Sequence, residues 1–306
     1  MIRAFQDPEI YRDILDRLQI GVSVVDLERK VVFWSDGAEQ ITGYPRLDVL
    51  GRSCTESILL HCNQSSCEMC TERCPVDAAL REGQPVEAMS FIHHKAGYRT
   101  QVHVWAIPLR DRGGSIIGVI QTFESESAVR GADPRDRRLA EQGWLDDVTG
   151  LPNQAMMQSH LRETLGAFQE THVPFGIIFV EAADLDRFRA RYGQGAARSI
   201  LQVLARTLRN TVWPTDIVGR WSDEKFVVIP MGCSEEALSA VCARMMRMLA
   251  SASIMWWGEE LSVKISLGRA AARPGDTQES LLARAFEDKQ TTLPAAGASA
   301  AASSQT

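Results

Sequence analysis

Residues 219–229, with the sequence GRWSDEKFVVI, decide how the second half of this chain folds. Apolar, β-forming side chains occupy both ends of this stretch, and the polar residues Ser222, Asp223 and Glu224 interrupt them. A polar break of this length between two β-rich segments is typical of a hairpin tip. The stretch therefore predicts two short antiparallel strands joined by a tight turn.

Length and composition indicate an ordinary globular protein with more than one domain. The chain has 306 residues, which is enough for two domains with separate hydrophobic cores. Hydrophobic residues make up 45% and charged residues 24% of the chain, and both values are usual for a globular protein. The net charge of -6 gives no electrostatic reason to expect a nucleic-acid partner.

The sequence also gives no signal for a membrane segment. No apolar run approaches the roughly 20 residues that a membrane-spanning helix requires. The first residues, MIRAFQDPEIYRD, carry acids where a signal peptide would have its apolar centre. We therefore expect a cytoplasmic protein without a membrane partner.

Residues 8–125 alternate short strands, short helices and turns, as in a compact α+β domain. The predicted strands cover residues 21–26, 31–34, 88–94, 99–109 and 115–124. In their order and in the turns between them, these elements resemble a PAS sensory domain. The resemblance implies an antiparallel sheet with flanking helices. Before the first strand, a short amphipathic helix is predicted from the helical spacing of Ile10, Ile14, Leu15 and Leu18.

A cluster of cysteines lies between the strands of this domain. Cys62, Cys67, Cys70 and Cys74 follow a C-x4-C-x2-C-x3-C pattern. Four thiolates complete a tetrahedral zinc or iron–sulfur site, and clustering in a reducing compartment indicates metal or redox chemistry. We expect one such centre here. The alternatives are a reversible disulfide within the cluster, or buried thiols without chemistry.

Residues 146–154, DDVTGLPNQ, contain a turn with Gly150 and Pro152 that leads into a helix. They resemble the Asp-x-Leu-Thr-Gly-Leu-Pro-Asn-Arg segment that opens GGDEF (diguanylate cyclase) domains. The hairpin at residues 219–229 resembles the Gly-Gly-Asp/Glu-Glu-Phe signature of the same family. The resemblance implies a nucleotidyl-cyclase palm, a βααββαβ-like sheet with helices.

The predicted organisation is α+β throughout, and a change of composition separates its parts. Residues 126–145 become charged and helical after the break at Asp133-Pro134. Resemblance to PAS–GGDEF proteins implies that such a helical linker pairs in a homodimer, and the alternative is a solvated spacer. The last residues are rich in Ala and Ser, which predicts disorder. The parts are the PAS domain with the cysteine cluster (8–125), the linker (126–145), the GGDEF domain (146–293) and the tail (294–306).

The resemblance implies two metal ions held between a carboxylate at the end of the first palm strand and the third residue of the hairpin. These ions assist a ribose hydroxyl in attacking the α-phosphate of a second GTP. The first palm strand is predicted at residues 174–180, PFGIIFV, and an ungapped alignment that starts there places Glu181 and Glu224 at the two carboxylate positions. The segment DLDRFR, which begins at Asp184, also resembles the family pattern. Aligning it requires a three-residue deletion, so we do not assign the metal-binding carboxylate to this segment.

Other positions implied by the resemblance are altered. Arg189 and Arg198 stand where the family has the Asn and Asp that bind guanine, and a guanidinium only donates hydrogen bonds. Ser222 and Asp223 replace the glycines that let the backbone approach the triphosphate. Lys225 replaces the acid after Glu224. Three further family residues are also replaced. The Asp of the closing helix is Phe286, the phosphate-binding Lys is Leu293, and the Arg of the product-binding site is Trp213.

These substitutions predict a catalytically degenerate GGDEF domain in c-di-GMP signalling. It would act by contact with a signalling protein or by nucleotide binding, with Mg²⁺ at Glu181 and Glu224, or GTP, bound only weakly. The alternative is an active diguanylate cyclase that makes c-di-GMP from two GTP with Glu181 and Glu224. A third hypothesis is a nucleotide-binding effector in which Arg189 and Arg198 bind phosphate instead of base.

Overall fold

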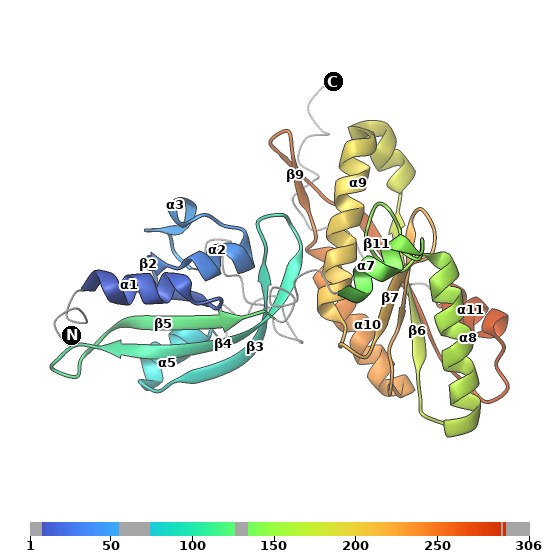
Figure 1. The fold of residues 1–306 in the computed structure, drawn as a ribbon, viewed down its shortest axis with the longest axis horizontal. Helices are drawn as coiled ribbons and strands as arrows, with labels where there is room; N and C mark the ends of the chain where they lie inside the picture. Colours follow the sequence, from blue (N-terminus) through green and yellow to red (C-terminus); the bar gives the residue numbers. More distant parts are fainter. Residues whose placement is uncertain (1–7, 55–73, 126–133, 289, 292–306) are drawn as a thin grey trace, which may run out of the picture. The chain divides into compact units, whose positions relative to one another are not determined.

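The computed structural model describes residues 8–54, 74–125, 134–288 and 290–291. The chain divides into two compact units, Met1–Gly131 and Ala132–Thr306, each with its own five-stranded sheet (Figure 1). In the described part of the chain, no helix is long and apolar enough to cross a membrane. The predicted tail at 294–306 lies outside the described residues.

The first unit contains an antiparallel sheet with the strand order β2-β1-β5-β4-β3. The strands are β1 (Gly21–Val25), β2 (Val31–Trp34), β3 (Val86–His93), β4 (Arg99–Arg110) and β5 (Ile116–Glu124). Each overlaps one of the strands that the alternation of apolar segments and turns predicts. The predicted PAS-like antiparallel sheet is therefore confirmed.

The helices of this unit are α1 (Pro8–Arg17), α2 (Asp36–Thr42), α3 (Arg46–Val49) and α5 (Pro75–Glu82). α2 begins where the Ser35 side chain accepts a hydrogen bond from the Ala38 amide at 3.1 Å, and it ends at Gly43 with a φ of 73°. Side chains from α2, α3, α5 and the inner face of the sheet form one core, in which Trp34 and Phe123 lie with ring centroids 5.9 Å apart.

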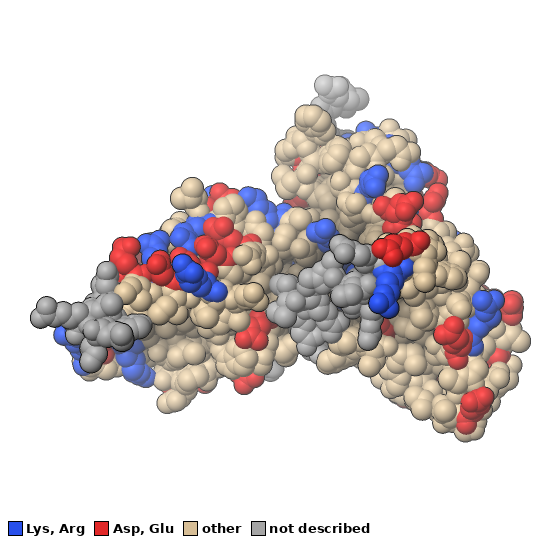
Figure 2. All heavy atoms as spheres, viewed as in Figure 1, with Lys and Arg blue, Asp and Glu red and all other residues tan. Residues whose placement is uncertain are grey.

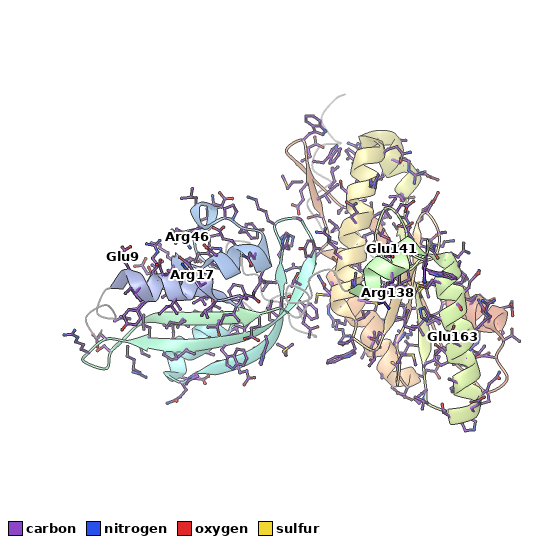
Figure 3. The ribbon with its side chains drawn as sticks, in the orientation of Figure 1. Glu9, Arg17, Arg46, Arg138, Glu141 and Glu163 are labelled. Carbon is purple, nitrogen blue, oxygen red and sulfur yellow. The ribbon has the colours of Figure 1, made fainter. Side chains whose placement is uncertain are left out.

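The predicted amphipathic helix corresponds to α1. Arg46, labelled in Figure 3, donates to Asp16 at 2.7 Å and so fastens the end of α1 to the rest of the unit. Part of the apolar stripe nevertheless remains exposed, because Ile14 and Leu18 are 45% and 40% accessible. Within the predicted linker the structure contains the helix α7 (Pro134–Glu141).

The second unit contains a sheet with the order β12-β11-β6-β8-β7, in which all neighbours are antiparallel. The small hairpin of β9 and β10 lies apart from this sheet. The strands are β6 (Gly176–Ala183), β7 (Ile217–Arg220), β8 (Lys225–Ile229), β9 (Ile254–Trp256), β10 (Glu259–Leu261), β11 (Lys264–Ala271) and β12 (Gln290–Thr291). The helices are α8 (Gln154–Thr171), α9 (Leu185–Thr211), α10 (Glu235–Ala250) and α11 (Gln278–Glu287).

β6 is the central strand, and helices cover both faces of the sheet around it (Figure 1). Ile177 and Phe179 of β6 pack with side chains of α8 and α11 in one core. On the other side, α10 packs against β11 and against α9. Burial on both faces explains why β6 is almost continuously apolar.

α9 contains a kink at Gly193, which has a φ of 86° and a ψ of 170°. Glycine adopts this backbone conformation without the clash that a Cβ would cause. The kink divides α9 into two helices between the first two strands of the sheet. This arrangement agrees with the βααββαβ-like order that the resemblance implies, and the predicted α+β fold is confirmed.

Candidate functional site

The hairpin at β7 and β8 has the form that its sequence predicts. Arg220 pairs with Phe226 across the two strands. The Trp221 amide donates to the Lys225 carbonyl at 2.7 Å, and the Ser222 amide donates to the same carbonyl at 3.1 Å. The tip therefore consists of the polar residues between Trp221 and Lys225.

The side chain of Arg220 makes several contacts with this tip. The Arg220 side chain donates to the carbonyl of Ser222 at 3.0 Å and to that of Asp223 at 2.6 Å. Its third donor contacts Asp146 Oδ1 at 3.1 Å, and the Arg220 side chain is only 8% accessible. Arg220 thus fixes the hairpin and joins it to the segment that opens the domain.

The opening segment folds as a compact turn around Asp146. The carboxylate of Asp146 accepts hydrogen bonds from the amide and the hydroxyl of Thr149, at 2.8 and 2.7 Å. Gly150 closes the turn with a φ of 67°, and the carbonyl of Pro152 accepts from the Arg220 amide at 2.7 Å. Burial alone would raise the pKa of Asp146, but the Thr149 hydrogen bonds and the Arg220 guanidinium hold it below its usual value.

Asp146 and Arg220 were not among the predicted site residues. Both belong to the segments that resemble the family, so each could be recognised separately. Their contact joins positions 74 residues apart. Spacing along a sequence does not show a contact of that kind.

Glu181 lies directly opposite Lys225 in the pairing of β6 with β8. Its Oε1 atom is 3.7 Å from Lys225 Nζ. The neighbouring amide of Ala182 donates to the carbonyl of Glu224 at 2.8 Å. The structure therefore brings Glu181 next to the hairpin tip, where Glu224 immediately precedes Lys225.

Asp184 occupies a different place. It follows the end of β6, has a φ of 64°, and lies 3.8 Å from Lys264 Nζ on β11. Among the carboxylates considered from sequence, Glu181 is the one that pairs with the hairpin strand. Strand β6 continues to Ala183, beyond the predicted end at Val180, because its last residues pair with β11.

The space beside Glu181 and Lys225 is small. Phe286 of α11 stacks on Phe179 with ring centroids 3.8 Å apart, and Lys225 Nζ lies 5.4 Å from the centroid of the Phe286 ring. The crevice that these side chains line together with Ser266 has a volume of about 10 Å³. That volume accommodates about one water molecule.

The two arginines expected at the guanine-binding positions lie on α9, on either side of the kink. Arg189 donates to Asp186 Oδ1 at 3.1 Å. Arg198 donates to the carbonyl of Asp147, within the opening segment, at 3.3 Å. Each guanidinium thus has a partner of its own within the domain.

Only one residue of the predicted cysteine centre belongs to the described part of the chain. Cys62, Cys67 and Cys70 lie outside it, whereas Cys74 precedes α5 and is buried. Cys54 is buried in the same core. Burial, and the neighbouring Cys74, raise the pKa of the Cys54 thiol to about 11.

Within the described residues, no three or more His, Cys, Asp or Glu side chains are grouped so that they could hold a metal ion. Glu181 and Glu224 therefore supply at most two carboxylate groups for a cation. On the face shown in Figure 2, Lys and Arg side chains are interspersed with Asp and Glu.

Two family models match this chain. The model described as "Diguanylate cyclase, GGDEF domain" matches residues 143–292, and that of the PAS fold matches residues 9–124. The probable diguanylate cyclase DgcE of Escherichia coli (strain K12) is 24% identical over 267 residues, which are 86% of this chain and 23% of that protein. An uncharacterized signaling protein of Caulobacter vibrioides is 31% identical over 163 residues, 51% of this chain and 19% of that protein.

A solved structure is also similar. The crystal structure of a sensory box/GGDEF family protein from Caulobacter crescentus CB15 has 26% sequence identity and a TM-score of 0.44, and the match covers 47% of this chain and 94% of that chain. The chain spans about a quarter or less of the length of the two curated relatives named above.

Proposed function

Because this chain consists of a PAS domain followed by a GGDEF domain, we propose that it is a protein of c-di-GMP signalling whose GGDEF domain makes no c-di-GMP. Its output would be contact with another signalling protein, or binding of a nucleotide without turnover. The PAS domain would supply the sensory input.

The observation that carries this proposal is the ion pair between Lys225 and Glu181. Cyclase chemistry of the family's kind needs metal ions held by carboxylates to neutralise the phosphates that react. Here an ammonium group faces one of the two carboxylates, and Glu181 and Glu224 together offer little for a cation. The residues present therefore do not fit the family's two metal ions.

The altered nucleotide positions support the same proposal. Ser222 and Asp223 add side chains, and Asp223 a negative charge, at the tip where a triphosphate would approach. Arg189 and Arg198 present only donors at positions where guanine recognition requires an acceptor. Since several parts of one site are changed together, we expect the loss of activity to be nearly complete.

The alternative, an active cyclase, is favoured by one observation. The hairpin and the opening segment keep their mutual contacts through Arg220 and Asp146. A scaffold held in this way could still support slow turnover with Glu181 and Glu224. Incubation of the purified chain with GTP and Mg²⁺ separates the two functions, because only the active enzyme yields c-di-GMP.

We further propose a homodimer that forms through α1 and the linker helix. The partial exposure of Ile14 on α1, and of Leu18 directly after it, supports this assembly, since exposed apolar side chains are stabilised by burial against a second copy. Light scattering at micromolar concentration tests it. A monomer would contradict the proposal.

The cysteine centre also remains a proposal. Cys62, Cys67, Cys70 and Cys74 would bind zinc, or an iron–sulfur cluster that makes the PAS domain a redox sensor. Metal and acid-labile sulfide should be measured in protein purified without oxygen, together with the Cys70→Ser variant. About one centre per chain, lost in Cys70→Ser, is the expected result. Protein without metal or sulfide, in which all thiols titrate, would contradict it.

A further inference from the structure

We propose that Lys225 excludes divalent cations from the carboxylates of Glu181 and Glu224, so that a fixed ammonium group takes the place of a bound metal ion. The inference deepens the proposed function, because it assigns the weakness of the metal site to one residue. It concerns the binding of metal and not turnover. It can therefore fail or hold independently of whether the chain makes c-di-GMP.

The first support is the register of the sheet. Glu181 on β6 and Lys225 on β8 are direct cross-strand partners, and Nζ lies 3.7 Å from Oε1. Opposite charges in facing positions of a sheet attract each other. Both side chains are partly shielded from water, with accessibilities of 34% for Lys225 and 23% for Glu181, so solvent screens this attraction less than at an open surface.

The second support is the ring beneath the ammonium group. Nζ of Lys225 lies 5.4 Å from the centroid of Phe286, and a cation is attracted to the face of an aromatic ring at this distance. Phe286 is itself held in place, because it stacks on Phe179 at 3.8 Å. Two separate attractions therefore keep the ammonium group beside Glu181.

The third support is the lack of room. The crevice next to the ion pair has a volume of about 10 Å³. Mg²⁺ in proteins usually keeps several of its water molecules, and a single water already fills a space of this size. A hydrated cation therefore does not fit into this crevice, which lies on the Glu181 side of the pair of carboxylates and is not lined by Glu224.

The position of Glu224 completes the argument. Its carbonyl accepts from Ala182 at 2.8 Å, which holds this residue next to the strand that carries Glu181. Glu224 also directly precedes Lys225 in the chain. Because Lys225 Nζ lies 3.7 Å from Glu181 Oε1, a dication that Glu181 shared with Glu224 would lie close to the ammonium group, and like charges at short range repel.

The same domain offers a matched control. Lys264 on β11 lies 3.8 Å from Asp184, which is nearly the distance between Lys225 and Glu181. Lys264 pairs with Ala183 of the strand that contains Glu181. Removing its charge takes a lysine of similar ion-pair distance out of the same sheet but leaves the Glu181 ion pair in place.

The test is a titration of the full chain with Mn²⁺, followed by electron paramagnetic resonance of the free ion. Mn²⁺ prefers carboxylate ligands, so thiols compete little for it. We expect Lys225→Gln to bind Mn²⁺ about tenfold more tightly than the unmodified chain, because the repulsion is gone. Lys264→Gln should bind as the unmodified chain does. Adding Glu181→Gln to Lys225→Gln should remove the gain.

Two results would overturn the proposal. One is equal Mn²⁺ affinity of the unmodified chain and Lys225→Gln, and the other is a gain that persists when Glu181 is also changed to Gln. Circular dichroism verifies that each variant is folded. If Lys225→Gln does not fold, Lys225→Met keeps the apolar stem over Phe286 and must show the same gain. Lys225→Arg retains the charge and should show none.

Discussion

The guanidinium of Arg220 donates to Oδ1 of Asp146 at 3.1 Å and thereby connects the signature hairpin to the turn that opens the same domain. The same side chain also donates to two carbonyls of the hairpin tip. One arginine therefore determines the position of the tip relative to the rest of the sheet. The contact between Arg220 and Asp146 can be tested from either side chain.

Replacing Arg220 should destabilise the domain more than replacing an arginine that has the same ion-pair distance but a more exposed partner. Arg220→Ala leaves Asp146 without its charged partner and removes one donor from each of two carbonyls of the hairpin tip, so we expect a loss of about 2–4 kcal/mol in the free energy of unfolding. Arg189→Ala is the matched control, because Arg189 also lies 3.1 Å from an aspartate, but that partner is 79% accessible. Arg189→Ala should lower the free energy of unfolding by less than about 1 kcal/mol. Urea unfolding measures both, and equal losses would contradict the assignment.

Asp146 should make the stability of the domain depend on acidity. The pKa of Asp146 is lowered in the folded chain, so its contribution is complete above the pKa of the unfolded chain, about 3.9. That contribution disappears as the pH falls through the lower, folded value. Asp146→Asn should therefore be less stable than the unmodified chain at pH 7, and the difference should narrow as the pH decreases below about 4. A difference that is constant with pH would show that the charge of Asp146 has no role.

Gly268 should not tolerate a side chain. A Cβ at this position of β11 would lie 2.0 Å from the Ala285 carbonyl oxygen and 3.0 Å from that of Asp288, so α11 would have to move. We expect Gly268→Ala to lower the free energy of unfolding by about 2 kcal/mol or more. Gly166→Ala in α8 meets nothing within 4 Å and should instead stabilise the chain by up to about 1 kcal/mol. Thermal unfolding of both variants is the measurement.

Cys54 should resist alkylation in the native PAS domain. Burial raises the pKa of its thiol to about 11, so little of the reactive thiolate is present at pH 8. The raised value also means that its contribution to stability is complete below the unfolded pKa of about 8.5 and is lost as the pH rises to about 11. Mass spectrometry after iodoacetamide treatment should find Cys54 unmodified until urea is added. Rapid labelling of Cys54 in the folded chain would contradict the burial of this thiol.

Much of the fold could be predicted from the sequence, because local patterns encode it. The polar break after Trp221 and the apolar segments around it predict the hairpin, and the structure has strands at both places. The predicted end of β6 is Val180, three residues before its observed end at Ala183. Residues after Val180 stay extended because they pair with β11, which is more than eighty residues away along the chain. Tertiary pairing of this kind leaves no local signal.

The site could be predicted less completely. The ungapped alignment selected Glu181 over Asp184, and the structure places Glu181 opposite the hairpin strand. The stacking of Phe286 on Phe179, and the ammonium group above it, could not be predicted, because both depend on where α11 packs. Phe286 was recognised only as a substitution for an aspartate.

The most direct test of the central claim is a search for product. The purified full chain is incubated with GTP and Mg²⁺ beside the Glu224→Ala variant, and both mixtures are analysed for c-di-GMP by liquid chromatography and mass spectrometry. If the domain is degenerate, as we propose, the unmodified chain forms no more c-di-GMP than Glu224→Ala. Product that the unmodified chain forms and Glu224→Ala does not would contradict the account and identify the chain as an active diguanylate cyclase.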